Sequence, residues 1–252
     1  MIGTQGRPRE WFDEAYWNCG GEKSLFAVDW YNQEDRTLIQ DAVNRAGLIA
    51  RLLPVDPILD VGCGVGHTVE ALRLSGREAV GVDWSHAGVR RRWTSSITEA
   101  CADHLPFRDG MFGGVTSWDF LEHIPLVTLP AVIQELARCG RWQFHAISAC
   151  LNSDIGDVSW MPSQDRSHCS MFSAHWWQHL FQRTIPGREW AIRTFPAMQY
   201  TSYLFGAVLV WCGEGPAPEL LTRYAEGWRK IYNQRQANPN LVITWPPGLE
   251  DD

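Results

Sequence analysis

Hydrophobic and polar positions follow two different periods along most of the chain. Apolar residues recur at helical spacing across 35–53, and the short apolar run at 57–61 has the length of a buried strand. The same alternation continues to residue 148, with strands expected at 78–82, 96–101, 113–117 and 142–148 and helices at 68–75, 87–93 and 127–138. This order predicts parallel strands joined by right-handed helical crossovers.

The pattern changes after residue 150. The stretch 151–182 is polar and loop-like before it ends in a predicted helix at 174–182, and two late strands at 190–195 and 204–211 are expected to form a hairpin. The predicted fold class is therefore α/β, a doubly wound and mostly parallel seven-stranded sheet of the Rossmann type with an antiparallel edge strand. An aromatic N-terminal cap and a substrate-covering insert are expected to flank it.

These elements divide the chain into three predicted parts. Residues 1–53 form the cap and its helix, 54–213 the catalytic domain with 151–182 as its insert, and 214–252 a C-terminal helix and tail. The length suits one large core. No run approaches the roughly 18 apolar residues of a membrane span, and the N-terminus lacks the layout of a signal peptide. We therefore expect a cytoplasmic protein without a membrane partner.

Composition narrows the choice of partner. The net charge of −7 is unfavourable for nucleic acid, because binding to phosphate backbones normally uses clustered Lys and Arg. The seven cysteines are widely spread without a C-x-x-C pair, which favours reduced thiols over disulfides or structural zinc. The 14 tryptophans suit aromatic walls around a ligand. We expect a small-molecule partner and a monomer or homodimer.

A glycine-rich turn follows the first predicted strand. The segment ILDVGCGVG places Asp60, Gly62, Gly64 and Gly66 where strand meets helix, and glycines there let the backbone turn sharply and a ligand approach closely. Such a turn is shared with dinucleotide-binding proteins. Asp83 sharpens the prediction, because it ends the second strand in GVDWS, where its carboxylate can accept both hydroxyls of a ribose.

Three motifs in order make the chain resemble the class I S-adenosylmethionine-dependent methyltransferases, in the branch with many small-molecule and ubiquinone-type enzymes. They are LDVGCGVG, GVDWS and ADHLPFRDGMFGGVTSWDFLEHIP, and the resemblance covers about 58–148. The segments YWNCGGEKSLF and SHCSMFSAHWWQHLF extend it, the latter being similar to the H-x-x-x-x-S-x-x-W-W segment of bacterial small-molecule members. The resemblance implies S-adenosylmethionine as cofactor and S-adenosylhomocysteine as product.

The resemblance also implies where the cofactor lies. The turn from Gly62 to Gly66, with Cys63 and Gly64 inside it and Asp60 before it, would cradle the methionine end, Asp83 would hold the ribose, and Trp84 would pack on the adenine.

The predicted adenine site departs from the family pattern. Alignment on the L-P-F triplet puts Cys101 where the family usually has an Asp near the adenine. Asp103 or the main chain near Ala102 is expected to serve instead. The alternative is that Cys101 is a small buried apolar residue rather than a functional thiol.

Trp118 and Asp119 follow the fourth predicted strand. They should line the cleft, because open α/β sheets bind ligands at the carboxyl ends of their strands. Nucleic-acid and protein amine methyltransferases of this fold often carry an Asn/Asp-Pro-Pro-aromatic tetrapeptide here, whereas this chain has SWDF. The missing prolines favour a small-molecule acceptor.

Two histidines are candidate general bases. His123 belongs to LEHIP and His168 to the predicted insert, and either would take a proton from the acceptor. A structural role for the Glu122–His123 pair at the start of the next helix is the alternative. The spacing Asp119, Glu122, His123 also resembles an acid-x-x-Glu-His arrangement associated with a divalent cation in ubiquinone-type O-methyltransferases, but the prediction is a site without metal.

Aromatic residues of the cap and insert are expected to contact the acceptor. Tyr16, Trp17, Tyr31 and Trp176 would close over it, and packing of the cap on the sheet is the competing interpretation. Methyl transfer is an in-line displacement at a carbon activated by positive sulfur, so the protein aligns the reactants, excludes water and removes a proton where needed.

The predicted function is methyl transfer to an O, N or C atom of a small molecule, such as a natural product or other secondary metabolite. A carrier- or nucleic-acid-bound substrate and a non-catalytic cofactor-binding regulator are the alternatives.

Overall fold

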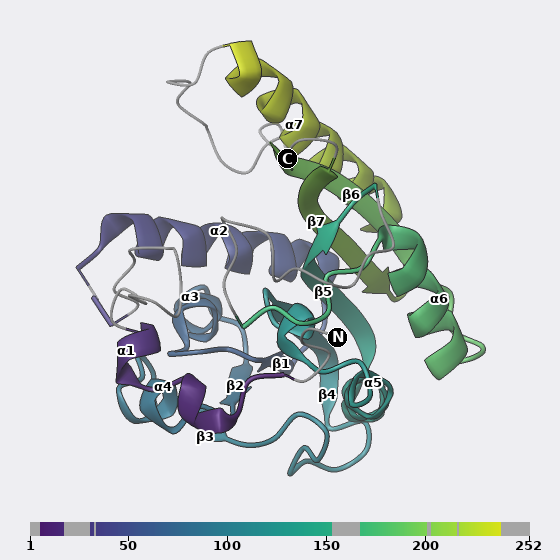
Figure 1. The fold of residues 1–252 in the computed structure, drawn as a ribbon. Coiled ribbons are helices and arrows are strands. Elements are labelled where there is room, and N and C mark those ends of the chain that lie inside the picture. The colour runs from purple at the N-terminus through teal and green to yellow at the C-terminus, as the bar shows by residue number, and fades with distance from the viewer. Residues whose placement is uncertain are drawn as a thin grey trace.

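The structure, a computed structural model, describes residues 6–17, 31–32, 34–152, 167–200, 203–215 and 217–237. A seven-stranded sheet forms its centre, in the order β3-β2-β1-β4-β5-β7-β6 (Figure 1). The strands are β1 Ile58–Val61, β2 Ala79–Asp83, β3 Ile97–Glu99, β4 Phe112–Trp118, β5 Gly140–Cys150, β6 Ala191–Tyr200 and β7 Tyr203–Cys212.

The first five strands run parallel, and β7 is antiparallel to both β5 and β6. From β1 the chain builds outward to β2 and β3, then returns to place β4 on the other side of β1. This reversal creates a crevice at the carboxyl ends of β1 and β4, where open α/β sheets bind ligands. The predicted fold class, a mostly parallel seven-stranded sheet with an antiparallel edge strand, is confirmed.

Helices cover both faces of the sheet. They are α1 Glu14–Trp17, α2 Arg36–Leu52, α3 His67–Leu74, α4 His86–Arg90, α5 Leu129–Cys139, α6 Ala174–Thr184 and α7 Ala217–Ala237, with short 3-10 turns η1 Arg9–Trp11 and η2 Leu121–His123. Apolar residues of α2, α3 and α7 share one core cluster, and those of α5 and α6 share the other. Helix α7 lies along β6 at the far edge of the sheet (Figure 1).

Several predicted elements differ in length from those observed: α4 ends at Arg90 instead of 93, and β6 continues to Tyr200 instead of 195. The fifth strand, expected at 142–148, extends over Gly140–Cys150, because β4 and β7 pair with it along most of that length. The third is shorter than expected and pairs with β2 alone over Ile97–Glu99. Part of the predicted insert, residues 153–166, lies outside the described residues, so the three-part division of the chain remains a prediction. None of the described helices is long and apolar enough to cross a membrane.

A buried polar chain links β4 to β5. His145 is fully buried, with Nδ1 2.8 Å from the Ser117 hydroxyl and Nε2 3.0 Å from Oε1 of Gln143. The Gln143 amide nitrogen donates to the carbonyls of Leu136 and Gly140, so its oxygen must accept from His145. Nε2 therefore carries the proton, and Nδ1 accepts from Ser117. Burial lowers the pKa of His145 to about 3.

We expect the wild type to lose more stability in acid than H145Q. The unfolded histidine takes up a proton near pH 6.5 while the folded one stays neutral down to about pH 3, so stability falls as the pH drops through this window. His145 alone should lower the free energy of unfolding by roughly 2 kcal/mol between pH 7 and pH 5. Denaturant unfolding of both proteins at both pH values measures the difference. Equal losses would show that His145 is protonated in the native state.

Candidate functional site

A cavity of about 280 Å³ opens at the carboxyl ends of β1, β2 and β4. Its walls come from the N-terminal segment, the glycine turn, the end of β2, the loop after β3, and the segment that runs from β4 into α5. This is the crevice that the strand order creates.

The backbone conformation and the packing of the glycine turn both require glycine. The amides of Gly62 and Cys63 both donate to the Val82 carbonyl, at 2.9 and 3.1 Å, which ties the turn to the end of β2. Gly62 lines the cavity with φ at +73°, and a Cβ there would overlap the Phe120 ring. Glycine is thus required at this position both for its conformation and for the room that it leaves.

G62A is expected to lose about 1–3 kcal/mol more stability than G76A. Both positions have positive φ, but a Cβ at Gly76 meets no atom within 4 Å whereas one at Gly62 meets Phe120. G76A therefore measures the conformational cost alone, and the further loss in G62A measures overpacking. Denaturant unfolding of the two variants checks the difference, and equal losses would mean that Phe120 moves aside freely.

Two backbone amides fix the position of the Asp83 carboxylate at the cavity wall. One carboxylate oxygen accepts the Gly64 amide at 2.9 Å, and the other accepts the Ser85 amide at 2.8 Å. Burial raises the pKa of Asp83 above its ordinary value, although these two hydrogen bonds oppose the rise. Each oxygen keeps a further lone pair. The carboxylate can accept two more hydrogen bonds from a diol without moving.

Residues predicted near the adenine lie together on the cavity wall. Trp84 is 37% exposed, and Cys101, Ala102 and Asp103 follow on the neighbouring loop. The Cys101 thiol hydrogen-bonds to Asp103 and lowers the pKa of that carboxyl. Cys101 is exposed rather than buried, so the interpretation as a buried apolar residue is wrong.

Arg138 of α5 holds this loop in place. Its guanidinium donates to the carbonyls of Leu105 and Phe107, at 3.1 and 2.7 Å, and pairs with Glu135. Glu135 in turn accepts the Leu105 amide at 2.8 Å. The loop that carries the predicted adenine contacts is therefore anchored to a helix by charge-assisted hydrogen bonds.

The N-terminal cap packs directly on the glycine turn. Tyr16 and Trp17 both line the cavity, and the Trp17 indole donates to the Ser85 hydroxyl at 2.9 Å. That hydroxyl donates to the Phe12 carbonyl at 2.6 Å. The Trp17 ring comes so close to Gly64 that a Cβ there would lie 2.9 Å from it. The contact that packs the cap on the glycine turn therefore also forms part of the cavity wall, so both interpretations of these aromatic residues hold for Tyr16 and Trp17.

Several predicted site residues are not among those that line the cavity. Tyr31 is nearly buried under the Arg91 guanidinium, which lies 4.0 Å from the ring centre, and Trp176 stacks on Phe172 at 3.7 Å. Trp118 contacts Phe144 and Arg45. Its neighbour Asp119 lines the cavity instead.

The remaining residues of the first motif lie beneath or behind the turn. Asp60 is buried, and burial raises its pKa to about 7. The Cys63 thiol faces β2, where a Cβ at Gly81 would lie 2.6 Å from the sulfur. Gly64 and Gly66 have positive φ, and Gly66 is the N-cap of α3. These residues shape the turn, while Gly62 forms the wall.

Asp119 has an unusual backbone for a residue with a side chain. Its φ is +49°, in the left-handed region, and such conformations carry strain and cluster at functional sites. Its amide donates to the Ala146 carbonyl at 3.0 Å, and its carboxylate lies 3.3 Å from Arg45 and 3.4 Å from the Ser148 hydroxyl. The acidic group is directed towards these two partners.

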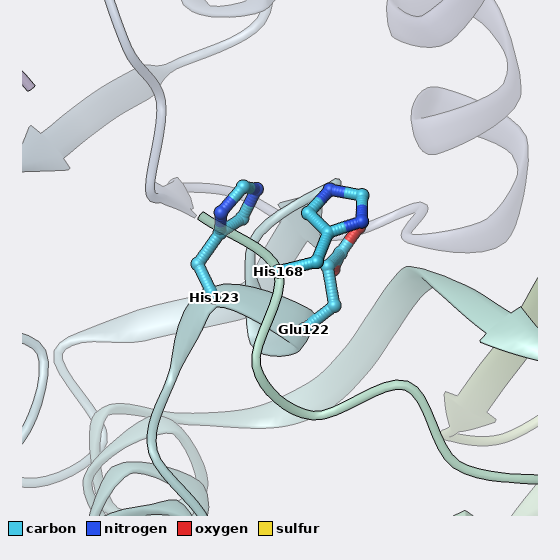
Figure 2. Close-up of side chains that lie close together, drawn as sticks. All are labelled: Glu122, His123 and His168. Atoms are coloured by element: carbon cyan, nitrogen blue, oxygen red, sulfur yellow. The ribbon is translucent and has the colours of Figure 1, made fainter. Parts of the chain in front are cut away.

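The two predicted bases lie side by side, next to a buried carboxyl (Figure 2). His123 lines the cavity, and its ring centre is 4.6 Å from that of His168. Glu122 is fully buried, and burial together with the charge of Asp119 raises its pKa well above the usual range. One ligand atom from each of Glu122, His123 and His168 lies within 4.8 Å of the other two, close enough for the three residues to hold a metal ion.

Some cavity residues escaped the sequence analysis. Gly6, Arg7 and Phe12 precede the first predicted helix, in a segment without periodicity, and only the tertiary fold brings them to the cavity. Phe120 follows directly on the SWD segment. Its position next to Asp119, at the expected edge of the sheet, is the signal that could have found it.

Comparisons with known proteins agree with this geometry. Residues 31–184 match a family model described as a methyltransferase domain. Ubiquinone biosynthesis O-methyltransferase of Bordetella parapertussis is 29% identical over 48% of this chain and 56% of its own length. The enzyme of that name from Methylococcus capsulatus is 32% identical over 50% and 53%. This chain thus spans about half the length of the curated relatives it matches.

A solved structure shows a likeness of fold over a larger share of the chain. Magnesium protoporphyrin IX methyltransferase from Synechocystis, solved with bound S-adenosylmethionine, superposes with a TM-score of 0.52. It covers 82% of this chain and 97% of that one at 18% identity. At this identity the likeness is one of fold alone.

Proposed function

Because the chain belongs to the methyltransferase domain family, we propose that it transfers a methyl group from S-adenosylmethionine to the oxygen of a small-molecule acceptor. Family membership confirms the predicted enzyme class and cofactor. The observation that carries the proposal is the Asp83 carboxylate, which two backbone amides hold rigidly at the cavity wall. The two curated relatives described above are named as O-methyltransferases of ubiquinone biosynthesis, which supports a hydroxyl acceptor. A natural-product acceptor remains a prediction.

We assign the cofactor to residues that surround Asp83. The Gly62 turn lets the methionine end approach the backbone, Asp83 accepts hydrogen bonds from the ribose, and Trp84 offers an aromatic face to the adenine. In this family an Asp usually binds the adenine at the position that Cys101 occupies here. We assign its role to Asp103, on the anchored loop. These roles suit the chain because the residues named all line the same cavity.

We assign the acceptor to the largely apolar part of the cavity lining. Phe12, Tyr16, Phe120 and Ile124 form it, and His123 lies among them. Apolar and aromatic side chains favour a ligand that presents an apolar or ring-shaped body. His123 and its neighbour His168 are the residues proposed to deal with the acceptor's proton. The protein's remaining contributions are alignment and exclusion of water.

Methyl-labelled S-adenosylmethionine and the full chain test this function. A panel of phenols, other alcohols, amines and bulk RNA serves as candidate acceptors, and the label is followed into each. We expect transfer to hydroxyl compounds and none to RNA. Transfer to RNA would favour the nucleic-acid alternative, and cofactor binding without transfer to any acceptor would favour a regulator.

A further inference from the structure

We propose that Glu122, His123 and His168 bind one divalent transition-metal ion, with Zn²⁺ as the expected ion, beside the acceptor end of the cavity. The three side chains come from two segments far apart in the sequence and lie close together (Figure 2). Their ligand atoms all lie within 4.8 Å of one another. Zinc bonds of about 2.0–2.2 Å in a tetrahedral arrangement need ligands about 3.4 Å apart, so small side-chain rotations complete the site.

The buried carboxyl points to a missing partner. Glu122 is fully buried, and its Oε1 accepts the Ser148 amide at 3.1 Å. Its Oε2 is equally buried but has no hydrogen-bond partner among the described residues. A buried polar atom without a partner is costly. A cation between this oxygen and the two imidazoles removes that cost.

Backbone contacts hold His168 at this place independently of any ion. The amides of Cys169 and Ser170 both donate to the Glu122 carbonyl, at 2.8 and 2.9 Å, and the Ser170 hydroxyl donates to the Ile124 carbonyl at 2.7 Å. The segment 167–170 is therefore fixed along η2. The fold itself thus brings the third ligand to the other two. A site that is formed before its ion binds requires this.

A serine hydroxyl orients one of the ligands. Metal-bound histidines usually donate their second ring N–H to an oxygen, which fixes the ring. The Ser167 hydroxyl lies 2.8 Å from Nδ1 of His123. With Nδ1 engaged in this way, Nε2 is the nitrogen that His123 offers to the ion.

The ligand set differs from the spacing noted in the sequence, in which Asp119 accompanies Glu122 and His123. The Asp119 carboxylate is directed towards Arg45 and Ser148. His168 takes its place, which changes the ion expected. Two imidazoles and one carboxylate favour Zn²⁺ or Co²⁺ over Mg²⁺, which prefers oxygen ligands.

Three protein ligands leave one tetrahedral position open. If the acceptor lies where the proposed function puts it, its hydroxyl oxygen can take that position. A cation lowers the pKa of an oxygen bound to it, so the hydroxyl releases its proton to water and keeps its electron pair for the methyl group. In this account the two histidines promote transfer as ligands rather than as free bases.

Cobalt binding tests the site without any acceptor. The full chain, freed of metal with a chelator, is titrated with Co²⁺ while visible absorption is recorded. We expect one tightly bound ion with the absorption of tetrahedral Co²⁺, which Zn²⁺ displaces and Mg²⁺ does not. Because no methyl transfer is measured, this result is independent of the proposed acceptor.

The variants H168A and E122Q should bind Co²⁺ roughly 100-fold more weakly or worse, since even indirect partners of metal ligands contribute 10- to 100-fold. The control is H179A, because His175 and His179 form an exposed pair on α6 with Nε2 atoms 3.0 Å apart that could also bind Co²⁺. S-adenosylhomocysteine affinity reports that each variant is folded. The proposal is overturned if the wild type binds no Co²⁺, or if H179A abolishes binding and folded H168A keeps it.

Discussion

D83A is expected to bind S-adenosylmethionine roughly 10- to 100-fold more weakly than the wild type. Two charge-assisted hydrogen bonds to the ribose should contribute about 1.5–3 kcal/mol together, and each 1.4 kcal/mol corresponds to a tenfold change in Kd. The variant also frees the Gly64 and Ser85 amides that the carboxylate accepts, which adds to the loss. Isothermal titration calorimetry with S-adenosylhomocysteine measures the effect.

E78A is the matched control for D83A. Glu78 immediately precedes β2 and is exposed, whereas Asp83 ends the same strand at the cavity. Its removal changes the net charge equally and should leave cofactor affinity unchanged. If folded D83A binds as tightly as E78A, the ribose is held by other residues and the assignment of the cavity wall is wrong.

Most of the fold could be predicted because its signals are local. The helix expected from residue 35 begins at Arg36, with Asp35 as the N-cap that accepts the Thr37 and Leu38 amides. The apolar run at 57–61 becomes β1, buried along its full length. In each case the signal lies within about 15 residues of sequence, in the spacing of apolar side chains and the caps that bound them.

The site was harder to predict where it depends on the direction of side chains. Trp118 and Asp119 occupy the expected edge of the sheet, but only Asp119 lines the cavity. Trp118 ends β4 and packs against Phe144, whereas Asp119 follows the strand with a left-handed backbone, a change of direction that the sequence did not indicate. Tyr31 and Trp176 likewise form other contacts.

The meeting of His123 and His168 has no local signal at all. It depends on amides of the segment 167–170 that donate to the Glu122 carbonyl, and any residue type could supply those amides. Sequence reasoning selected each histidine by its position in the fold. The buried carboxyl beside them and their contact with each other emerge only in three dimensions.

H123Q and H168Q are expected to lower methyl transfer about 10²- to 10⁴-fold, because each variant loses a group that promotes deprotonation of the acceptor, either as a general base or as a ligand of the proposed ion. Their S-adenosylhomocysteine affinity should stay close to that of the wild type, because neither histidine is among the residues assigned to the cofactor, which are grouped around Asp83 and the glycine turn. Single-turnover rates and calorimetry separate the two quantities. H179Q, on the exposed face of α6, controls for loss of an imidazole. If both variants turn over as fast as H179Q, the acceptor needs no deprotonation, and alignment with a neutral amine becomes the better account.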